Sequence, residues 1–320
     1  MNIKLDIPES FYAGEERCGY YVSPEMKKVW AVELDMIAEF ARICDKYSLR
    51  WWVEGGTLLG AARHKGFIPW DDDVDIVMMR KDYEKLCEIS GSEFQHPYHL
   101  RSPYNDKERI QEFAKLHNED TTMIDGISSA ALFRNGRKFG YSQGIWIDIF
   151  PLYDIPDNDE EFMPVLRKAR RYKETAGLLY TIAFAYTPAS TKWKRPFKAA
   201  LHFMSGFADI GARYMMKCFA KYFETINLLN SPDSKYVANI SPTTSHDFWK
   251  KFRVPRSFFD ETVYMTFEML TVPAPSCYET ILTQYYGEWQ KYVIGHLHST
   301  FYDTERSYKY YIEHGLPEGV

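Results

Sequence analysis

The sequence predicts an α/β protein of the α+β kind, with a mixed sheet and flanking helices, a helical insertion and a helical C-terminal part. Three patterns indicate this: an amphipathic stretch from Met26 to Tyr47, short apolar strands between Trp51 and Met79, and a further strand around Asp148. The chain has 320 residues, of which 45% are hydrophobic, so it is long enough to bury a large core.

The first predicted helix has clear start signals. Apolar residues from Met26 to Tyr47 recur at intervals of three and four, which is the spacing of one helix face. Ser23 is a favourable N-cap, and Pro24 is tolerated in a first helical turn. Shorter helices are expected from Thr57 to His64 and from Lys81 to Ile89.

Four regions follow from these patterns and from the charge distribution. Between residues 160 and 224, twelve Lys or Arg residues stand against five acids, although the whole chain has a net charge of −5. We expect an N-terminal arm at 1–23, a core at 24–156, a basic helical insertion at 157–235, and a C-terminal part at 236–320 that completes the core and a cleft.

Cysteine usage and hydropathy bear on the compartment. The five cysteines are an odd number without a CxxC pair, which argues against a disulfide framework and a cysteine zinc site. No secretory signal pattern follows Met1, and no run of eighteen apolar residues occurs. The expected location is cytoplasmic, and nothing indicates a nucleic-acid partner.

Acidic residues alternate with apolar ones just before Met79. Asp73 and Asp75 fall on one face of an extended chain, with Asp71 near them if the extended conformation begins early, while Asp72 points to the opposite face. Carboxylates placed so close together repel one another and normally hold a cation. This pattern therefore predicts a metal site.

A glycine pair precedes these acids. Gly55, Gly56 and Thr57 follow the first strand and open a short helix, whose free N–H groups would suit an anion such as phosphate. A plain tight turn explains a Gly-Gly pair equally simply. Both interpretations stay open.

The sequence GIWIDIFPL predicts another strand, with Asp148 set among apolar residues. A buried carboxylate is costly unless a metal, a cation or hydrogen-bond donors accompany it. The alternative is an aspartate that caps a turn at a strand end. Residues 112–117 and 121–124 are expected to form a strand pair of their own.

The set formed by the glycine pair, Asp73-Val74-Asp75 and Asp148 is similar to the active-site pattern of the nucleotidyltransferase fold. More closely, EGGTLLGAARHKGFIPWDDDVDI and the downstream GIWIDIFPL resemble the LicD family, which comprises phosphocholine-type transferases related to fukutin and fukutin-related protein. The resemblance covers about residues 26–155 and 250–290, whereas 157–235 resemble nothing identifiable.

This resemblance implies metal-dependent transfer of a phospho-alcohol from a CDP-activated donor, CDP-choline first, to a hydroxyl of a glycan that is lipid-linked or free. The acceptor types that the resemblance implies are lipopolysaccharide, teichoic acid and capsule. The metal would be Mg²⁺ or Mn²⁺, held by Asp73 and Asp75 with Asp71 directly or through water. Asp148 would be either a further metal ligand or the base that takes the proton of the attacking hydroxyl.

Positive groups must offset the charge of such a donor. Arg63 and Lys115 are the candidates for phosphate binding, together with the glycine turn, whereas His64 and Lys65 fit structural roles. Three tryptophans near the motif are compatible with an aromatic cage for a choline ammonium, but core packing is their commoner use. These tryptophans are Trp51, Trp52 and Trp70.

Three other classes of protein compete with this interpretation. An EF-hand loop starting at Asp71 would need glycine where Ile76 stands and glutamate where Asp82 stands. A glycosyltransferase could use Asp73-Val74-Asp75 to hold a nucleotide sugar. A binding protein of the same fold without catalysis is the third, and the intact set of acids speaks against it.

The basic insertion allows two interpretations as well. Its mixture of aromatic residues and lysines between Trp193 and Phe223 could form amphipathic helices that lie on anionic lipid at the inner membrane face. A helical subdomain packed on the core, with solvated lysines outside, is the alternative. His296 and His298 are too weak a pattern to predict a second metal site.

Overall fold

The computed structural model describes residues 1–105, 113–125, 143–184, 217–218, 220–222, 224–229, 233–239, 252–295 and 300–317. The elements up to the central strand are η1 (Glu9–Tyr12), β1 (Glu15–Arg17), β2 (Tyr20–Val22), α1 (Pro24–Tyr47), β3 (Trp52–Val53), α2 (Gly55–His64), β4 (Asp75–Met79), α3 (Arg80–Glu93), β5 (Tyr98–Arg101), β6 (Ala114–Asn118), β7 (Thr122–Asp125) and β8 (Trp146–Ile155). The later elements are α5 (Asp159–Phe184), β9 (Tyr236–Asn239), β10 (Arg253–Pro255), η4 (Arg256–Phe259), β11 (Thr262–Phe267), β12 (Leu270–Pro275), α9 (Tyr278–Tyr286), β13 (Thr300–Asp303) and α10 (Tyr308–His314).

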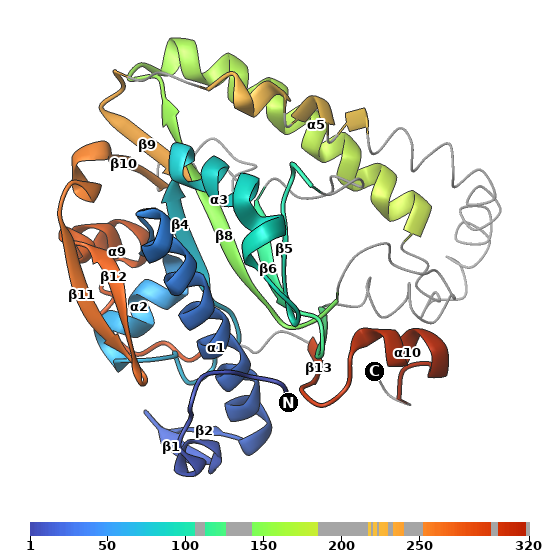
Figure 1. Ribbon diagram of the computed structural model, residues 1–320. Helices are drawn as coiled ribbons and strands as arrows, with labels where there is room; N and C mark the ends of the chain where they lie inside the picture. Colours follow the sequence, from blue (N-terminus) through green and yellow to red (C-terminus); the bar gives the residue numbers. More distant parts are fainter. Residues whose placement is uncertain are drawn as a thin grey trace, which may run out of the picture.

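Strand β8 is the centre of a seven-stranded mixed sheet (Figure 1). On one edge it pairs in parallel with β4, which in turn pairs antiparallel with β3. Its other edge pairs antiparallel with β6 in the first half and with β9 in the second half. The α+β fold class is confirmed.

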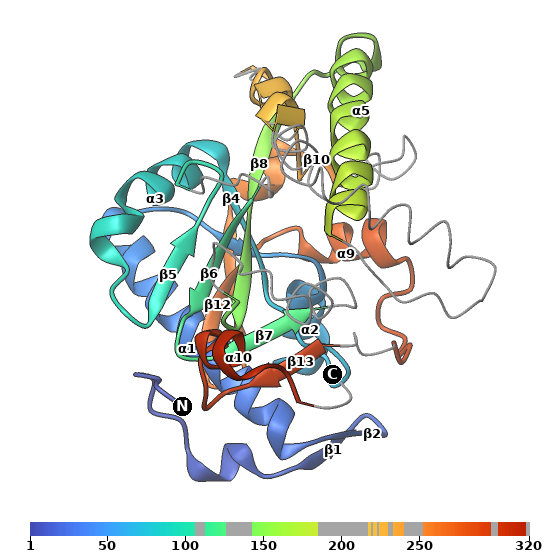
Figure 2. The ribbon, with the colours of Figure 1, turned by 90° about the vertical axis from the view of Figure 1, so that its right-hand side faces the viewer.

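Helices cover both faces of this sheet. Figure 2 shows α1 and α3 on one side, and α2, α9 and α5 on the other. Helix α1 begins as the sequence predicts, because the side-chain oxygen of Ser23 accepts a hydrogen bond from the N–H of Met26 at 3.2 Å. Its buried face is part of the main hydrophobic core, and Trp30, Leu34 and Phe40 are fully buried there.

Two expectations about strands are wrong. The predicted pair formed by residues 112–117 and 121–124 does not exist, because β6 pairs with β5 and β8, whereas β7 pairs with β13 near the C-terminus. The C-terminal part also contains more strand than predicted, since β10 extends the main sheet and β11 and β12 form a hairpin. Short strands that pair with distant partners leave little trace in local periodicity.

The described part of the insertion is helical. Phe162, Leu166 and Ala169 of α5 pack with Tyr153 and Ile155 of β8 in a second, smaller core. The lysines and arginine at 192, 194, 195 and 198 lie outside the described residues, as do His296 and His298. Within the described residues, none of the helices has both the length and the apolar character needed to cross a membrane.

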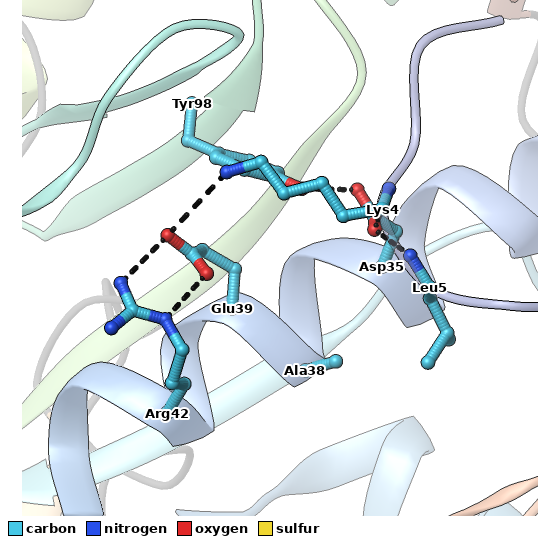
Figure 3. Close-up of a pocket in the computed structure, with 7 residues that line it drawn as sticks. All are labelled: Lys4, Leu5, Asp35, Ala38, Glu39, Arg42 and Tyr98. Carbon is cyan, nitrogen blue, oxygen red and sulfur yellow. Dashed lines mark hydrogen bonds and ion pairs between the residues drawn. The ribbon is translucent and has the colours of Figure 1, made fainter.

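The N-terminal arm is fastened to α1 by a buried carboxylate. Asp35 accepts hydrogen bonds from the backbone N–H groups of Lys4 and Leu5 at 2.7 and 2.8 Å, and from the hydroxyl of Tyr98 at 2.6 Å (Figure 3). Beside it, Glu39 pairs with Arg42. The polar and charged side chains that line the pocket in Figure 3 therefore have hydrogen-bond or ion-pair partners.

We predict that Asp35→Ala lowers the free energy of unfolding by about 2–4 kcal/mol. The reason is that the N–H groups of Lys4 and Leu5 and the hydroxyl of Tyr98 lose a charged acceptor, and the two N–H groups stay partly buried. Urea denaturation measures the effect. Asp45→Ala is the matched control, since Asp45 is exposed on the same helix, and it should change stability by less than about 0.5 kcal/mol. Equal stability of the two variants would contradict the role of Asp35.

Candidate active site

The acids predicted from the sequence converge at the start of β4 and β8. Asp75 and Asp148 are register neighbours on these two parallel strands. In the segment that leads into β4 and ends at its first residue, Asp75, the side chains of Asp71, Asp73 and Asp75 are partly exposed. Asp72 and Val74 between them are buried. This alternation places the three partly exposed acids on one face, as the period of two predicts.

The glycine pair allows the acids to approach the first turn of α2. A Cβ atom on Gly55 would lie 2.9 Å from Oδ2 of Asp75, and one on Gly56 would lie 2.7 Å from Oδ2 of Asp71. Gly55 also has a φ of +54°, which side chains disfavour. Thr57 accepts a hydrogen bond from the backbone N–H of Asp75 at 2.8 Å. The turn is thus fitted to the carboxylates.

The acids destabilise one another's charged forms. Burial, followed by the negative charges of Asp71 and Asp148, raises the pKa of Asp73 well above its ordinary value. Burial and the charges of Asp73 and Asp148 raise the pKa of Asp75 in the same way, and burial with the charge of Asp72 raises that of Asp71. A cation at this face would relieve the repulsion.

Lys115 supplies a positive charge to this face. Its ammonium lies 3.0 Å from Oδ1 of Asp148 and 3.9 Å from the centre of the Trp146 ring, and its side chain is mostly buried. Strand β6 positions it, because Lys115 is the register partner of Asp148. Lys115 therefore lies beside the acid cluster. Its position as a single lysine in an apolar strand suggested a charged partner but did not identify it.

Arg63 and its neighbours lie elsewhere. The Nη1 atom of Arg63 donates to the backbone carbonyls of Trp289 and Lys291 at 2.8 and 2.9 Å, and its role as a phosphate ligand stays a prediction. His64 contacts the ring of Trp70 edge-on at a centroid distance of 6.1 Å. These residues tie the end of α2 to other parts of the chain.

The three tryptophans considered for an aromatic cage are buried. Trp52 donates a hydrogen bond to the hydroxyl of Thr262 at 3.0 Å, and Trp51 packs edge-on against Phe40. Trp70 is 8% exposed. Their positions favour core packing over a cage.

Several residues around the acids were not predicted from the sequence. Glu54 is buried beside the glycine turn and accepts a hydrogen bond from the hydroxyl of Tyr285 at 2.9 Å. Glu33 of α1 is also buried, and burial, with the charges of the aspartates, raises its pKa well above the ordinary value. Asp72 accepts a hydrogen bond from the hydroxyl of Tyr302. Only the tertiary fold brings these partners together.

The carboxylate oxygens of Asp73 and Asp75 are the kind of ligand that a small divalent cation prefers, although they do not form a complete coordination sphere. No group of three or more His, Cys, Asp or Glu side chains among the described residues is arranged to hold a metal ion. Mg²⁺ commonly takes only one or two carboxylates and fills its other positions with water and substrate phosphate. Two neighbouring aspartates with raised pKa values meet that requirement.

A mixed sheet with acids on two adjacent parallel strands, beside a glycine turn that opens a helix, defines a nucleotidyltransferase-like domain. Residues 48–176 match the family described as LicD/FKTN/FKRP, nucleotidyltransferase domain. This domain of the chain is of the LicD family.

Individual relatives agree with this assignment. Lipopolysaccharide cholinephosphotransferase LicD of Haemophilus influenzae is 27% identical over 269 residues, which are 81% of this chain and 88% of that protein. Ribitol 5-phosphate transferase FKRP of Homo sapiens is 43% identical over 51 residues, which are 16% of this chain and 10% of that protein. An uncharacterized protein of Rickettsia prowazekii is 52% identical over 44 residues, or 14% and 16% of the two chains.

The buried acid Glu54 generates a prediction about pH. Burial raises its pKa to about 7 from 4.5, so the folded state holds the proton more tightly than the unfolded state between these values. The free energy of unfolding should therefore fall as pH rises from about 4.5 to 7, by up to about 3 kcal/mol from this group. Glu54→Gln keeps the acceptor for Tyr285 and should remove this component.

Chemical denaturation from pH 4.5 to 8 measures both proteins. The variant should be the more stable one at pH 8 and close to the wild type at pH 4.5. Parallel pH profiles for the two proteins would rule out a buried, proton-binding Glu54.

Proposed function

We propose that this protein transfers a phospho-alcohol from a CDP-activated donor, CDP-choline first, to a hydroxyl group of a cell-surface glycan. The observation that carries the proposal is the cluster of Asp71, Asp73, Asp75 and Asp148 within a domain of the LicD family. The two named relatives transfer cholinephosphate and ribitol 5-phosphate, which supports a phospho-alcohol as the transferred group.

The reaction we propose is a displacement at phosphorus. The oxygen of the glycan hydroxyl forms a bond to the phosphorus that carries the alcohol, and the bond between that phosphorus and the bridging oxygen breaks. CMP leaves with the electron pair. The proton of the attacking hydroxyl passes to a carboxylate, and the products are CMP and the phospho-alcohol ester of the glycan.

Mg²⁺ or Mn²⁺ is the cofactor in this proposal. Asp73 and Asp75 would hold it, with Asp71 directly or through water. The bound cation would neutralise charge on the diphosphate. The fit rests on the raised pKa values of these acids and on the room that Gly55 and Gly56 leave beside them. Thr57 supports the same turn from within.

Asp148 is the base in this proposal. Lys115 at 3.0 Å fixes its carboxylate next to Asp75, at the edge of the acid cluster. A positioned carboxylate can accept the proton of an attacking hydroxyl as the bond to phosphorus forms. Lys115 also brings a positive charge to the place where the anionic donor must bind.

We place the reaction at the cytoplasmic side of the membrane, with a soluble or lipid-linked glycan as acceptor. The basic segment between residues 160 and 224 supports a peripheral contact with anionic lipid. In the described part of this segment, the basic residues lie on α5 and on the short helical stretch that follows.

The first prediction from this proposal concerns the metal. Asp73→Asn and Asp75→Asn should reduce turnover to background while the protein stays folded, since each loses a charged ligand without a change of volume. Titration calorimetry with MgCl₂ should show weakened binding, and excess chelator should stop the wild-type reaction until Mg²⁺ or Mn²⁺ is restored.

Two further variants complete that experiment. Asp260→Asn alters an exposed acid away from the cluster and should leave activity unchanged. Asp148→Asn should keep Mg²⁺ and donor affinity while the transfer rate falls roughly a hundred- to ten-thousandfold. A joint loss of Mg²⁺ affinity in Asp148→Asn would make Asp148 a metal ligand, and normal turnover in Asp73→Asn would refute the metal site.

The second prediction separates this function from sugar transfer. With a CDP-alcohol donor, the spent nucleotide should be CMP, and the glycan should gain one phosphate for each CMP released. Anion-exchange chromatography of the nucleotides and phosphate analysis of the glycan measure both. Release of a nucleoside diphosphate from a nucleotide sugar, with no CMP from any CDP-alcohol, would instead identify a glycosyltransferase.

A further inference from the structure

The end of helix α9 lies at the rim of the acid cluster. The hydroxyl of Tyr285 is hydrogen-bonded to Glu54, and Glu54 directly precedes the glycine that contacts Asp75. The next residue, Tyr286, is 46% exposed, and Gly287 ends the helix with a φ of +67°. The negative charges of Asp75, Glu54 and Asp71 add to the effect of burial in raising the pKa of Tyr286.

Arg63 holds the chain that follows α9. Its two hydrogen bonds to the carbonyls of Trp289 and Lys291 join this segment to α2, the helix whose first turn contacts the acids. Its guanidinium also lies over the ring of Tyr292 at 5.2 Å. Three contacts from a single side chain fix the segment relative to the site.

The fixed segment presents apolar side chains to solvent. Tyr292 is 56% exposed although Arg63 lies against its ring, and Val293 and Ile294 beside it are exposed as well. Gly295 then lies close against the indole of Trp70, the residue before Asp71, because a Cβ there would be 3.1 Å from that ring. The acceptor wall, as we call residues 286–294, therefore begins near the acid cluster at the end of α9 and reaches the C-terminal end of α2.

The chemistry of this wall indicates what it can bind. Nearby carboxylates repel an anion such as a donor phosphate. A small organic cation is held best over aromatic faces that surround it, whereas Tyr286 lies edge-on to Tyr285, with ring centroids 6.2 Å apart. The exposed tyrosines at the two ends of this segment offer flat apolar faces and hydroxyls together, which match neutral sugar rings.

We propose that the acceptor wall binds the neutral sugar rings of the acceptor glycan, with Tyr286 and Tyr292 in contact with them and Arg63 as the residue that positions Tyr292. This inference deepens the proposed function and rests on it for the identity of the acceptor. Binding of a sugar chain at this wall would bring a hydroxyl to the acids without a need for charge on the glycan.

The experiment measures glycan binding and transfer separately. The probe is an oligosaccharide of neutral hexoses, titrated into wild type, Tyr286→Ala, Tyr292→Ala and Arg63→Lys while tryptophan fluorescence is followed. Loss of one aromatic contact should weaken binding about three- to tenfold. Arg63→Lys should weaken it too, because lysine cannot donate to two carbonyls in the fixed fork geometry of arginine.

Tyr264→Ala is the matched control, since Tyr264 is a 73% exposed tyrosine on β11 and lies outside the acceptor wall. In transfer assays Tyr286→Ala and Tyr292→Ala should raise KM for the oligosaccharide, while acceptor-free hydrolysis of CDP-choline stays within about twofold of wild type. Thermal melting confirms that each variant is folded.

The outcomes distinguish the two proposals. Absence of oligosaccharide binding by the wild type at millimolar concentration, or unchanged affinity in Tyr286→Ala and Tyr292→Ala, overturns the acceptor wall. A loss of donor hydrolysis equal to the loss of transfer overturns it also, because the wall would then serve the donor. Wall-dependent binding without any release of CMP supports the wall and counts against the proposed reaction.

Discussion

The repulsion between carboxylates on β4 and β8 is the constraint on which the arrangement of this protein depends. Asp75 and Asp148 are adjacent across a parallel strand pair, and Asp71 and Asp73 lie on the same face. Such a cluster is unfavourable by itself, since each acid raises the pKa of its neighbours. The surrounding structure must therefore hold the acids in place, and it does so from several elements.

Each of these elements contributes a specific contact. Trp30 of α1 donates a hydrogen bond to the carbonyl of Asp71 at 3.1 Å, and Thr57 of α2 accepts one from the N–H of Asp75. Lys115 of β6 balances Asp148. Trp30 and Thr57 thus fix the backbone around the acids, whereas Lys115 contacts the carboxylate of Asp148 itself.

The sequence was most informative where the determinants of structure are local. The cap and apolar spacing of α1, the alternation around Asp73, and the glycine pair are all encoded within a few residues, and their elements were predicted closely. The pairing of β7 with β13 joins residues about 180 positions apart, and the hydrogen bond from Tyr285 to Glu54 spans 231. Periodicity carries no information about partners at such separations, so these contacts were missed.

Arg63 illustrates the same limit at the level of a single residue. Its position between the glycine turn and the acids indicates a phosphate ligand, because arginine suits that role and the neighbouring motif binds charge. The structure directs its guanidinium to two carbonyls that are more than 220 residues away in the chain. Only the fold decides which of two chemically reasonable partners an arginine meets.

The two roles of the site are consequently supplied by different parts of the chain. In the proposed reaction, the acids between residues 71 and 75 and Asp148 would serve the donor, whereas the exposed Tyr286, Tyr292, Val293 and Ile294 would border the acceptor. A catalyst that joins an anionic donor to an uncharged hydroxyl benefits from this separation, because groups that attract the donor would otherwise compete with the acceptor for the same surface. The hydrogen bonds from Arg63 to Trp289 and Lys291 hold the C-terminal segment against α2, so the proposed acceptor surface is positioned before any substrate binds.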